Sequence, residues 1–236
     1  MTMDYDEDDY PRYISAAERK KQAAEQLAKL QRSGGKPEPI VVTARSIAKT
    51  FWGQAWNRHI ESFQDYASRL PRGRSYLRQG AVVDLKIREG EIEALVLGSE
   101  LYHIHIRIDK LDPERWNAIR KACAGRISSL IDLLQGKLSQ EIIEVLCDPE
   151  TGLFPAHGEI KLICDCPDWA DLCKHLAAVL YGVGVRLDEQ PELFFLLRGV
   201  DRQELLDSDW SGDMQGETTL ENDDLGGMFG IDLDHL

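Results

Sequence analysis

Hydrophobic residues recur at helical spacing in some parts of the chain and alternate with polar residues in others. Between Ser46 and Arg69 the large apolar residues recur every three to five positions, which predicts one long helix whose buried face includes two tryptophans. Residues 81–87, 91–97 and 101–108 instead alternate apolar with polar side chains between short turns that contain glycine. This pattern predicts three strands of a small antiparallel sheet.

The third predicted strand carries two histidines on one face. A period of two places His103, His105 and Arg107 opposite a row of isoleucines. We interpret the histidine row as a polar face toward solvent. Metal ligation by the histidines and nucleic-acid contact beside Arg107 are the alternatives.

The second half of the chain is predicted to be mainly helical. Residues 112–146 contain two or three helical patterns. A strand that ends near Cys164 follows, and after a loop an apolar helix begins near Cys173 and ends at Gly182 or Gly184. These elements predict an α+β protein, with a small antiparallel sheet, several helices and a strand-loop-helix module.

Composition divides the chain into four parts. Residues 1–39 comprise an acidic start, a solvated helix and a proline-containing linker. The helix, with Ser15 in a capping box, is either a simple tether or a helix that docks on a partner. Residues 40–150 form the basic α+β body, residues 151–206 the strand-loop-helix module with its following helices, and residues 207–236 an acidic tail that we expect to be mostly disordered.

Charge is distributed unevenly along the chain. The net charge is −13, yet residues 11–130 hold 22 basic and 13 acidic side chains, whereas residues 131–200 hold 5 basic and 12 acidic ones. We therefore expect any contact with nucleic-acid phosphate on the first of these segments. The sequence has no apolar run of the roughly 20 residues that span a bilayer, no signal-peptide pattern and an odd number of cysteines. These features predict a cytoplasmic protein with no membrane partner.

Four arginines and a tyrosine lie close together in the basic segment. They are Arg69, Arg72, Arg74, Tyr76 and Arg78. Arginine suits phosphate and an aromatic ring can stack on a base, so this stretch is predicted to be a loop that binds DNA weakly and with strong salt dependence. The alternative is a solvated turn whose arginines pair with local carboxylates, although residues 67–83 contain no acid.

The strand-loop-helix module contains three of the five cysteines and one of the six histidines. The spacing is Cys164-x-Cys166, six residues, and then Cys173-x-His175. Residues two apart on a strand point the same way, and the first turn of a helix favours a thiolate, so the four side chains can meet at one ion. Three sulfur ligands and one nitrogen ligand predict a structural Zn²⁺ site.

This ligand pattern resembles the SWIM-type zinc fingers, whose signature is Cys-x-Cys, a variable gap and Cys-x-His followed by an apolar helix. The body is also similar to bacterial SWIM zinc finger proteins in its Phe-Trp-Gly-Gln-Ala-Trp helix, its Arg-Gly-Arg-Ser-Tyr loop and its Gly-Ser turn before the third strand. The resemblance implies a zinc-bound unit that binds DNA or protein. It also implies an association with SNF-type ATP-dependent helicases, and it does not imply catalysis.

The predicted site is structural, because four protein ligands leave no open position on zinc for water. Neither catalysis nor a small-molecule substrate is therefore expected. The acids Asp165, Asp168 and Asp171 face only Lys174 among nearby bases and would repel phosphate, so we expect the zinc module to dock a protein or to organise the fold. A zinc-linked thiol redox sensor and a purely protein-binding adaptor are the alternatives.

The acidic tail contains a group of apolar residues close to the end of the chain. They are Leu225, Met228, Phe229, Ile231 and Leu233. Such a group in an acidic setting is typical of a short helix that folds onto a basic-rimmed groove of a partner. Packing against the body of its own chain is the alternative.

Overall fold

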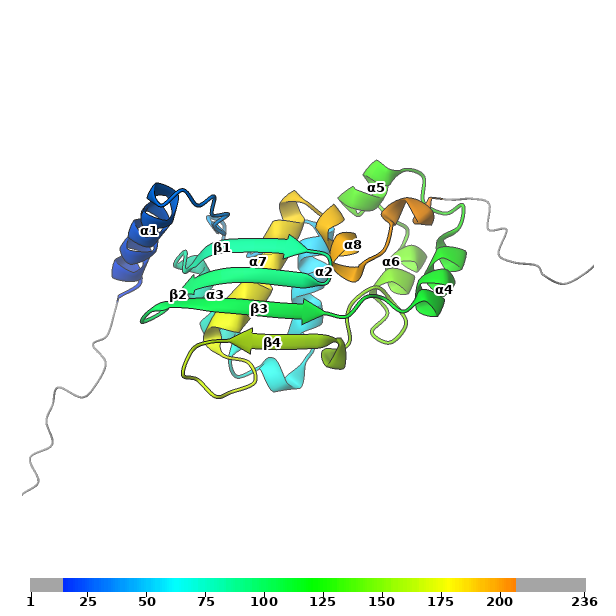
Figure 1. Ribbon diagram of the computed structural model, residues 1–236. Helices are drawn as coiled ribbons and strands as arrows, with labels where there is room; N and C mark the ends of the chain where they lie inside the picture. Colours follow the sequence, from blue (N-terminus) through cyan, green and yellow to red (C-terminus); the bar gives the residue numbers. More distant parts are fainter. Residues whose placement is uncertain (1–14, 207–236) are drawn as a thin grey trace, which may run out of the picture.

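The computed structural model describes residues 15–206, which form a four-stranded antiparallel sheet with helices packed on one face and at its ends (Figure 1). The strands lie in the order of the sequence: β1 (Val82–Arg88), β2 (Glu91–Leu97), β3 (Leu101–Ile108) and β4 (Ile160–Cys164). The prediction of an α+β fold with an antiparallel sheet is confirmed. The fourth strand ends in the first of the predicted metal ligands, so the strand-loop-helix module shares its sheet with the body.

Helices make up most of the remaining structure. They are α1 (Ala16–Arg32), α2 (Phe51–Glu61), α3 (Leu70–Arg78), α4 (Pro113–Cys123), α5 (Leu130–Gln135), α6 (Gln140–Cys147), α7 (Lys174–Glu189) and α8 (Glu192–Arg198), with short 3-10 turns η2 (Gln64–Tyr66), η3 (His157–Glu159) and η4 (Arg202–Leu205). Within residues 15–206 no helix is long and apolar enough to cross a membrane.

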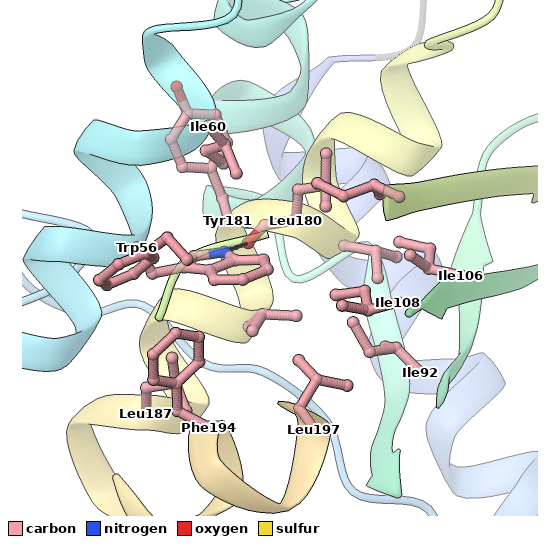
Figure 2. Close-up of a cluster of buried hydrophobic side chains, with 14 of the residues drawn as sticks. Trp56, Ile60, Ile92, Ile106, Ile108, Leu180, Tyr181, Leu187, Phe194 and Leu197 are labelled. Atoms are coloured by element: carbon pink, nitrogen blue, oxygen red, sulfur yellow. Dashed lines mark hydrogen bonds between the residues drawn. The ribbon is translucent and has the colours of Figure 1, made fainter. Parts of the chain in front are cut away.

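The central helix is α7, which lies across one face of the sheet with α2 and α3 on the same side of the sheet (Figure 1). Twelve of its side chains or glycines are buried, whereas a surface helix normally buries only one stripe. Figure 2 shows isoleucines of the sheet pointing toward α7 and Trp56 of α2 packing on it from the other side. The Trp56 indole N–H donates to the Leu180 carbonyl oxygen at 2.7 Å, which satisfies a polar atom inside the core.

Two glycine contacts let the neighbouring helices approach α7 closely. A Cβ on Gly53 of α2 would lie 2.3 Å from the Gly184 carbonyl oxygen, and a Cβ on Gly73 of α3 would lie 2.5 Å from the Ala177 Cβ. The prediction that Gly182 or Gly184 ends the helix is therefore wrong. Tight packing, which is a long-range effect, requires glycine at position 184, and the helix continues through it.

The predicted helix from Ser46 to Arg69 is also wrong in its extent. Within this range only α2 is an α-helix, and the short turn η2 follows it. The arginine-rich segment, which was predicted to be a loop, is the helix α3. Pro71 lies in the first turn of α3, where a missing N–H costs nothing, and Gly73 faces α7. These two residues thus serve helix entry and helix packing.

The three strands of the body follow their predicted alternation. In β3 the isoleucines are buried, whereas His103 and Arg107 are exposed and His105 is half-buried on the other face of the sheet. The prediction of a polar outer face is confirmed. β4 pairs with β3 through residues 160–164, and on the opposite edge the Leu85 N–H donates to the Glu38 carbonyl oxygen.

A buried arginine holds the start of β4 against the helices at the end of the sheet. Arg198 of α8 has no exposed surface, and its guanidinium donates to the Asp109 carbonyl oxygen and lies 3.3 Å from the Glu159 carboxylate. Glu159 also accepts from the Ala156 N–H. These contacts fix the entry to the strand that carries Cys164.

We predict that Gly53→Ala destabilises the protein by about 1–3 kcal/mol, because the added methyl group forces α2 away from the α7 backbone. The matched control is Gly158→Ala, whose added Cβ would have no atom within 4 Å. Denaturant unfolding measures both free energies. Equal stability of the two variants would show that the α2–α7 contact is not tight.

Candidate metal centre

The four predicted ligands meet where β4 ends and α7 begins. Cys164 is the last residue of β4, Cys173 is the N-cap of α7 and His175 lies in its first turn. The sulfur atoms of the three cysteines and a ring nitrogen of His175 all lie within 4.8 Å of one another. The structure thus brings Cys164, Cys166, Cys173 and His175 together as a possible metal site.

The distances fit a tetrahedral ion after a small contraction. The His175 Nδ1 atom lies 3.8 Å from the Cys173 Sγ and 4.0 Å from the Cys164 Sγ. With Zn–S and Zn–N bonds of about 2.3 and 2.0 Å, tetrahedral ligand atoms lie about 3.6–3.8 Å apart. The donor set suits zinc, and such an ion would hold the loop 167–172 at both ends.

The environment of the sulfur atoms favours negative charge at one of them. A hydrogen bond from the Cys164 thiol lowers the pKa of Cys173, whereas burial of Cys173 raises it. Further hydrogen bonds from His175 and the Leu176 N–H also lower the pKa, and the net result is a value of about 4. The same interaction with Cys173, together with burial, raises the pKa of Cys164. A thiolate at the N-terminus of α7 attracts a cation, and the cation in turn favours deprotonation of the other two thiols.

The His175 ring is held by residues from two other elements. The centroid of the His175 ring lies 4.5 Å from the ring centroid of Tyr102 on β3 and 5.4 Å from that of Tyr76 on α3. A Cβ on Gly98 would lie 2.6 Å from the His175 Nε2 atom, so the Gly-Ser turn before β3 leaves room for the ligand. The Nδ1 atom is thereby aimed at the sulfur atoms.

The loop between Cys166 and Cys173 carries an exposed tryptophan that the sequence analysis did not single out. Trp169 is 96% exposed. Beside it, the Asp168 carboxylate lies 3.6 Å from the Arg69 guanidinium and accepts from the Ala170 N–H. The available signal was that this tryptophan stands between Asp168 and Asp171, in the short loop that joins the two ligand pairs.

The predicted nucleic-acid residues differ in the contacts that their side chains make. Arg69 pairs with Asp168 beside the metal loop, whereas Arg74 lies against Tyr181 and Arg78 donates to the Arg45 carbonyl oxygen. Tyr76 lies under Arg19 of α1 and against His175. Arg72 is exposed. Arg74 and Arg78 instead share a pocket with Arg45 and Arg58, which are too distant in the sequence to have been grouped with them.

The structure bears on the histidines of β3 but not on the apolar motif of the tail. Within residues 15–206, Cys164, Cys166, Cys173 and His175 form the only group of three or more clustered metal-ligand side chains, so His103 and His105 belong to no such group. The tail motif lies outside the described residues. It consists of Leu225, Met228, Phe229, Ile231 and Leu233.

Comparison with known proteins adds one relative. An uncharacterized protein of Mycobacterium tuberculosis, Rv2102, is 35% identical over 180 residues, which cover 72% of this chain. The chain spans 65% of the length of that relative. No family model matches the sequence, and no solved structure matches it.

We predict that the purified full chain binds one equivalent of zinc and that Cys173→Ser removes it, because the variant loses a ligand and the N-cap thiolate of α7. Cys147→Ser is the matched control, since its half-buried thiol lies outside the cluster. Elemental analysis after dialysis measures the metal content. Equal zinc in both variants would exclude the Cys173 ligand.

Proposed function

We propose that this chain is a non-catalytic, zinc-stabilised accessory factor that docks a partner protein through the loop between Cys166 and Cys173. The observation that supports this most strongly is the exposure of Trp169, at 96%, on a loop whose two ends are metal ligands. Exposed tryptophan is unfavourable in water, and tryptophan is enriched among the residues that dominate binding energy at interfaces. A loop fixed by a metal presents it with little loss of entropy on binding.

The ligand set supports a structural zinc rather than a catalytic one. Three cysteines and a histidine complete a tetrahedral coordination sphere, whereas a catalytic zinc keeps a position for water or substrate. Cys173 and His175 are also buried. The role that follows for the ion is to fix the loop and the first turn of α7.

The charge around Trp169 favours a protein over a nucleic acid at this surface. Asp165, Asp168 and Asp171 lie on the loop or at its ends, and of these Asp168 pairs with Arg69. The remaining acids repel phosphate and favour a partner that offers an apolar pocket with a basic rim. The predicted role of the loop in protein docking is thereby strengthened.

The identity of the partner rests on the resemblance to bacterial SWIM zinc finger proteins, which implies an SNF-type ATP-dependent helicase. A weak, salt-dependent DNA contact through the α3 arginines is the second part of the proposal. None of the five cysteines, all within the described residues, forms a disulfide, which agrees with a reducing compartment, and we propose a cytoplasmic location.

We expect affinity capture with the intact chain to enrich an SNF-type helicase, identified by mass spectrometry, in lysate treated with nuclease. Trp169→Ala should reduce that enrichment roughly 30-fold, since loss of an interface tryptophan commonly costs about 2 kcal/mol. Ile131→Ala is the control, because Ile131 is 66% exposed on α5, far in sequence from the metal loop. Unchanged capture by Trp169→Ala would refute docking through this loop, and absence of the helicase with the wild-type chain would refute the partner.

A further inference from the structure

We propose that a pocket beside α7 binds a phosphate ester group through four arginines. The pocket has a volume of about 390 Å³ and is formed by residues 45–48, α2 and α3, with Tyr181 of α7 at its wall. Its guanidinium groups come from three separate elements. They belong to Arg45, Arg58, Arg74 and Arg78.

The pocket carries an excess of positive charge. Glu61 is the one carboxylate among its described lining residues, and it already accepts from the Arg74 guanidinium at 2.6 Å and from the Tyr181 hydroxyl at 2.8 Å. Within residues 15–206 the guanidinium groups of Arg45 and Arg58 have no ion-pair or hydrogen-bond partner. Four cations against one carboxylate leave an anion of charge −1 or −2 as the natural ligand.

Two of the four arginines are held in place before any ligand binds. The Arg74 Nε–H donates to the Tyr181 hydroxyl oxygen at 2.7 Å, and Tyr181 in turn donates to Glu61. Burial raises the pKa of Tyr181, so the phenol stays protonated and keeps this direction of donation. The Arg78 guanidinium donates to the Arg45 carbonyl oxygen at 2.6 Å, which ties α3 to the segment before α2. A preorganised pair of this kind lowers the entropic cost of binding an anion.

Phosphate fits this arrangement better than a carboxylate does. A phosphate group accepts hydrogen bonds on several oxygens in different directions, which matches forked donors that converge from three elements. The amide side chains of Gln54 and Asn57 also line the pocket. The volume lies within the range of small-ligand sites, about 300–1,000 Å³, and leaves room for the group esterified to the phosphate.

The phosphate ester that binds this pocket could come from two sources, and one of them is the DNA of the proposed function. The proposed pocket deepens the weak DNA contact suggested there, because a backbone phosphate is the ester that such a contact would supply. A soluble phosphorylated molecule has the same chemistry and is the second source. The pocket itself does not depend on which of the two is correct.

The test uses the zinc-loaded full chain and compares Arg45→Gln/Arg58→Gln with Arg32→Gln/Arg126→Gln, a control pair that belongs neither to the pocket nor to the predicted nucleic-acid residues. Both double variants lose two positive charges from exposed positions, but only the first pair lines the pocket. Titration with inorganic phosphate, followed by amide chemical shifts, is one arm. Binding of a 20-base-pair DNA duplex at several salt concentrations is the other arm.

We expect phosphate to shift the amides of the pocket in the wild-type chain and in the control, and to shift them at least tenfold less in Arg45→Gln/Arg58→Gln. The same variant should bind DNA at least tenfold more weakly at low salt, with a salt slope smaller by roughly 1–2. If the pocket variant loses phosphate binding but the wild-type chain does not bind DNA, the result would support the pocket and refute the DNA part of the proposed function. Phosphate binding that is absent from the wild-type chain, or equal in the two double variants, would overturn the pocket.

Discussion

The close packing of α7 against its neighbours is the constraint on which both the fold and the candidate sites depend. The start of this helix holds two of the four candidate metal ligands, its middle lies against the sheet, and its glycine at position 184 contacts α2. Farther along the helix, the Asp188 carboxylate accepts the Lys49 and Thr50 N–H groups just before α2. One buried helix therefore links the metal cluster, the sheet and the helix that leads into the arginine pocket.

Two of the segments on which the expected resemblance to SWIM zinc finger proteins rests support this helix. In the Phe-Trp-Gly-Gln-Ala-Trp segment, Gly53 and Trp56 contact α7 directly. In the Arg-Gly-Arg-Ser-Tyr segment, Gly73 packs on α7 and Tyr76 lies against the ligand His175. Their first role is structural, and the second segment also supplies Arg74 to the arginine pocket.

Local patterns were sufficient to predict the strands and the metal cluster, because alternation and ligand spacing act over a few residues. Sequence failed where a distant contact decides the local conformation. Gly184 was expected to end its helix but is a site of close helix contact, and the segment expected to be an arginine loop is a helix whose Gly73 packs on α7. Arg58 and Arg78 could not be grouped in advance, since only the packing of α2 beside α3 brings them to one pocket.

The two proposed surfaces differ in charge, and α7 connects them. The acidic loop ends at Cys173, the N-cap of α7, and Tyr181 of the same helix lines the arginine pocket. If the metal organises this arrangement, the loop and the start of α7 must depend on it more than the sheet does. Amide hydrogen exchange of the full chain with and without zinc measures this directly. Zinc removal should abolish protection in residues 165–178 while β1 to β3 stay protected; unchanged exchange in residues 165–178 would show that the metal does not hold the docking loop.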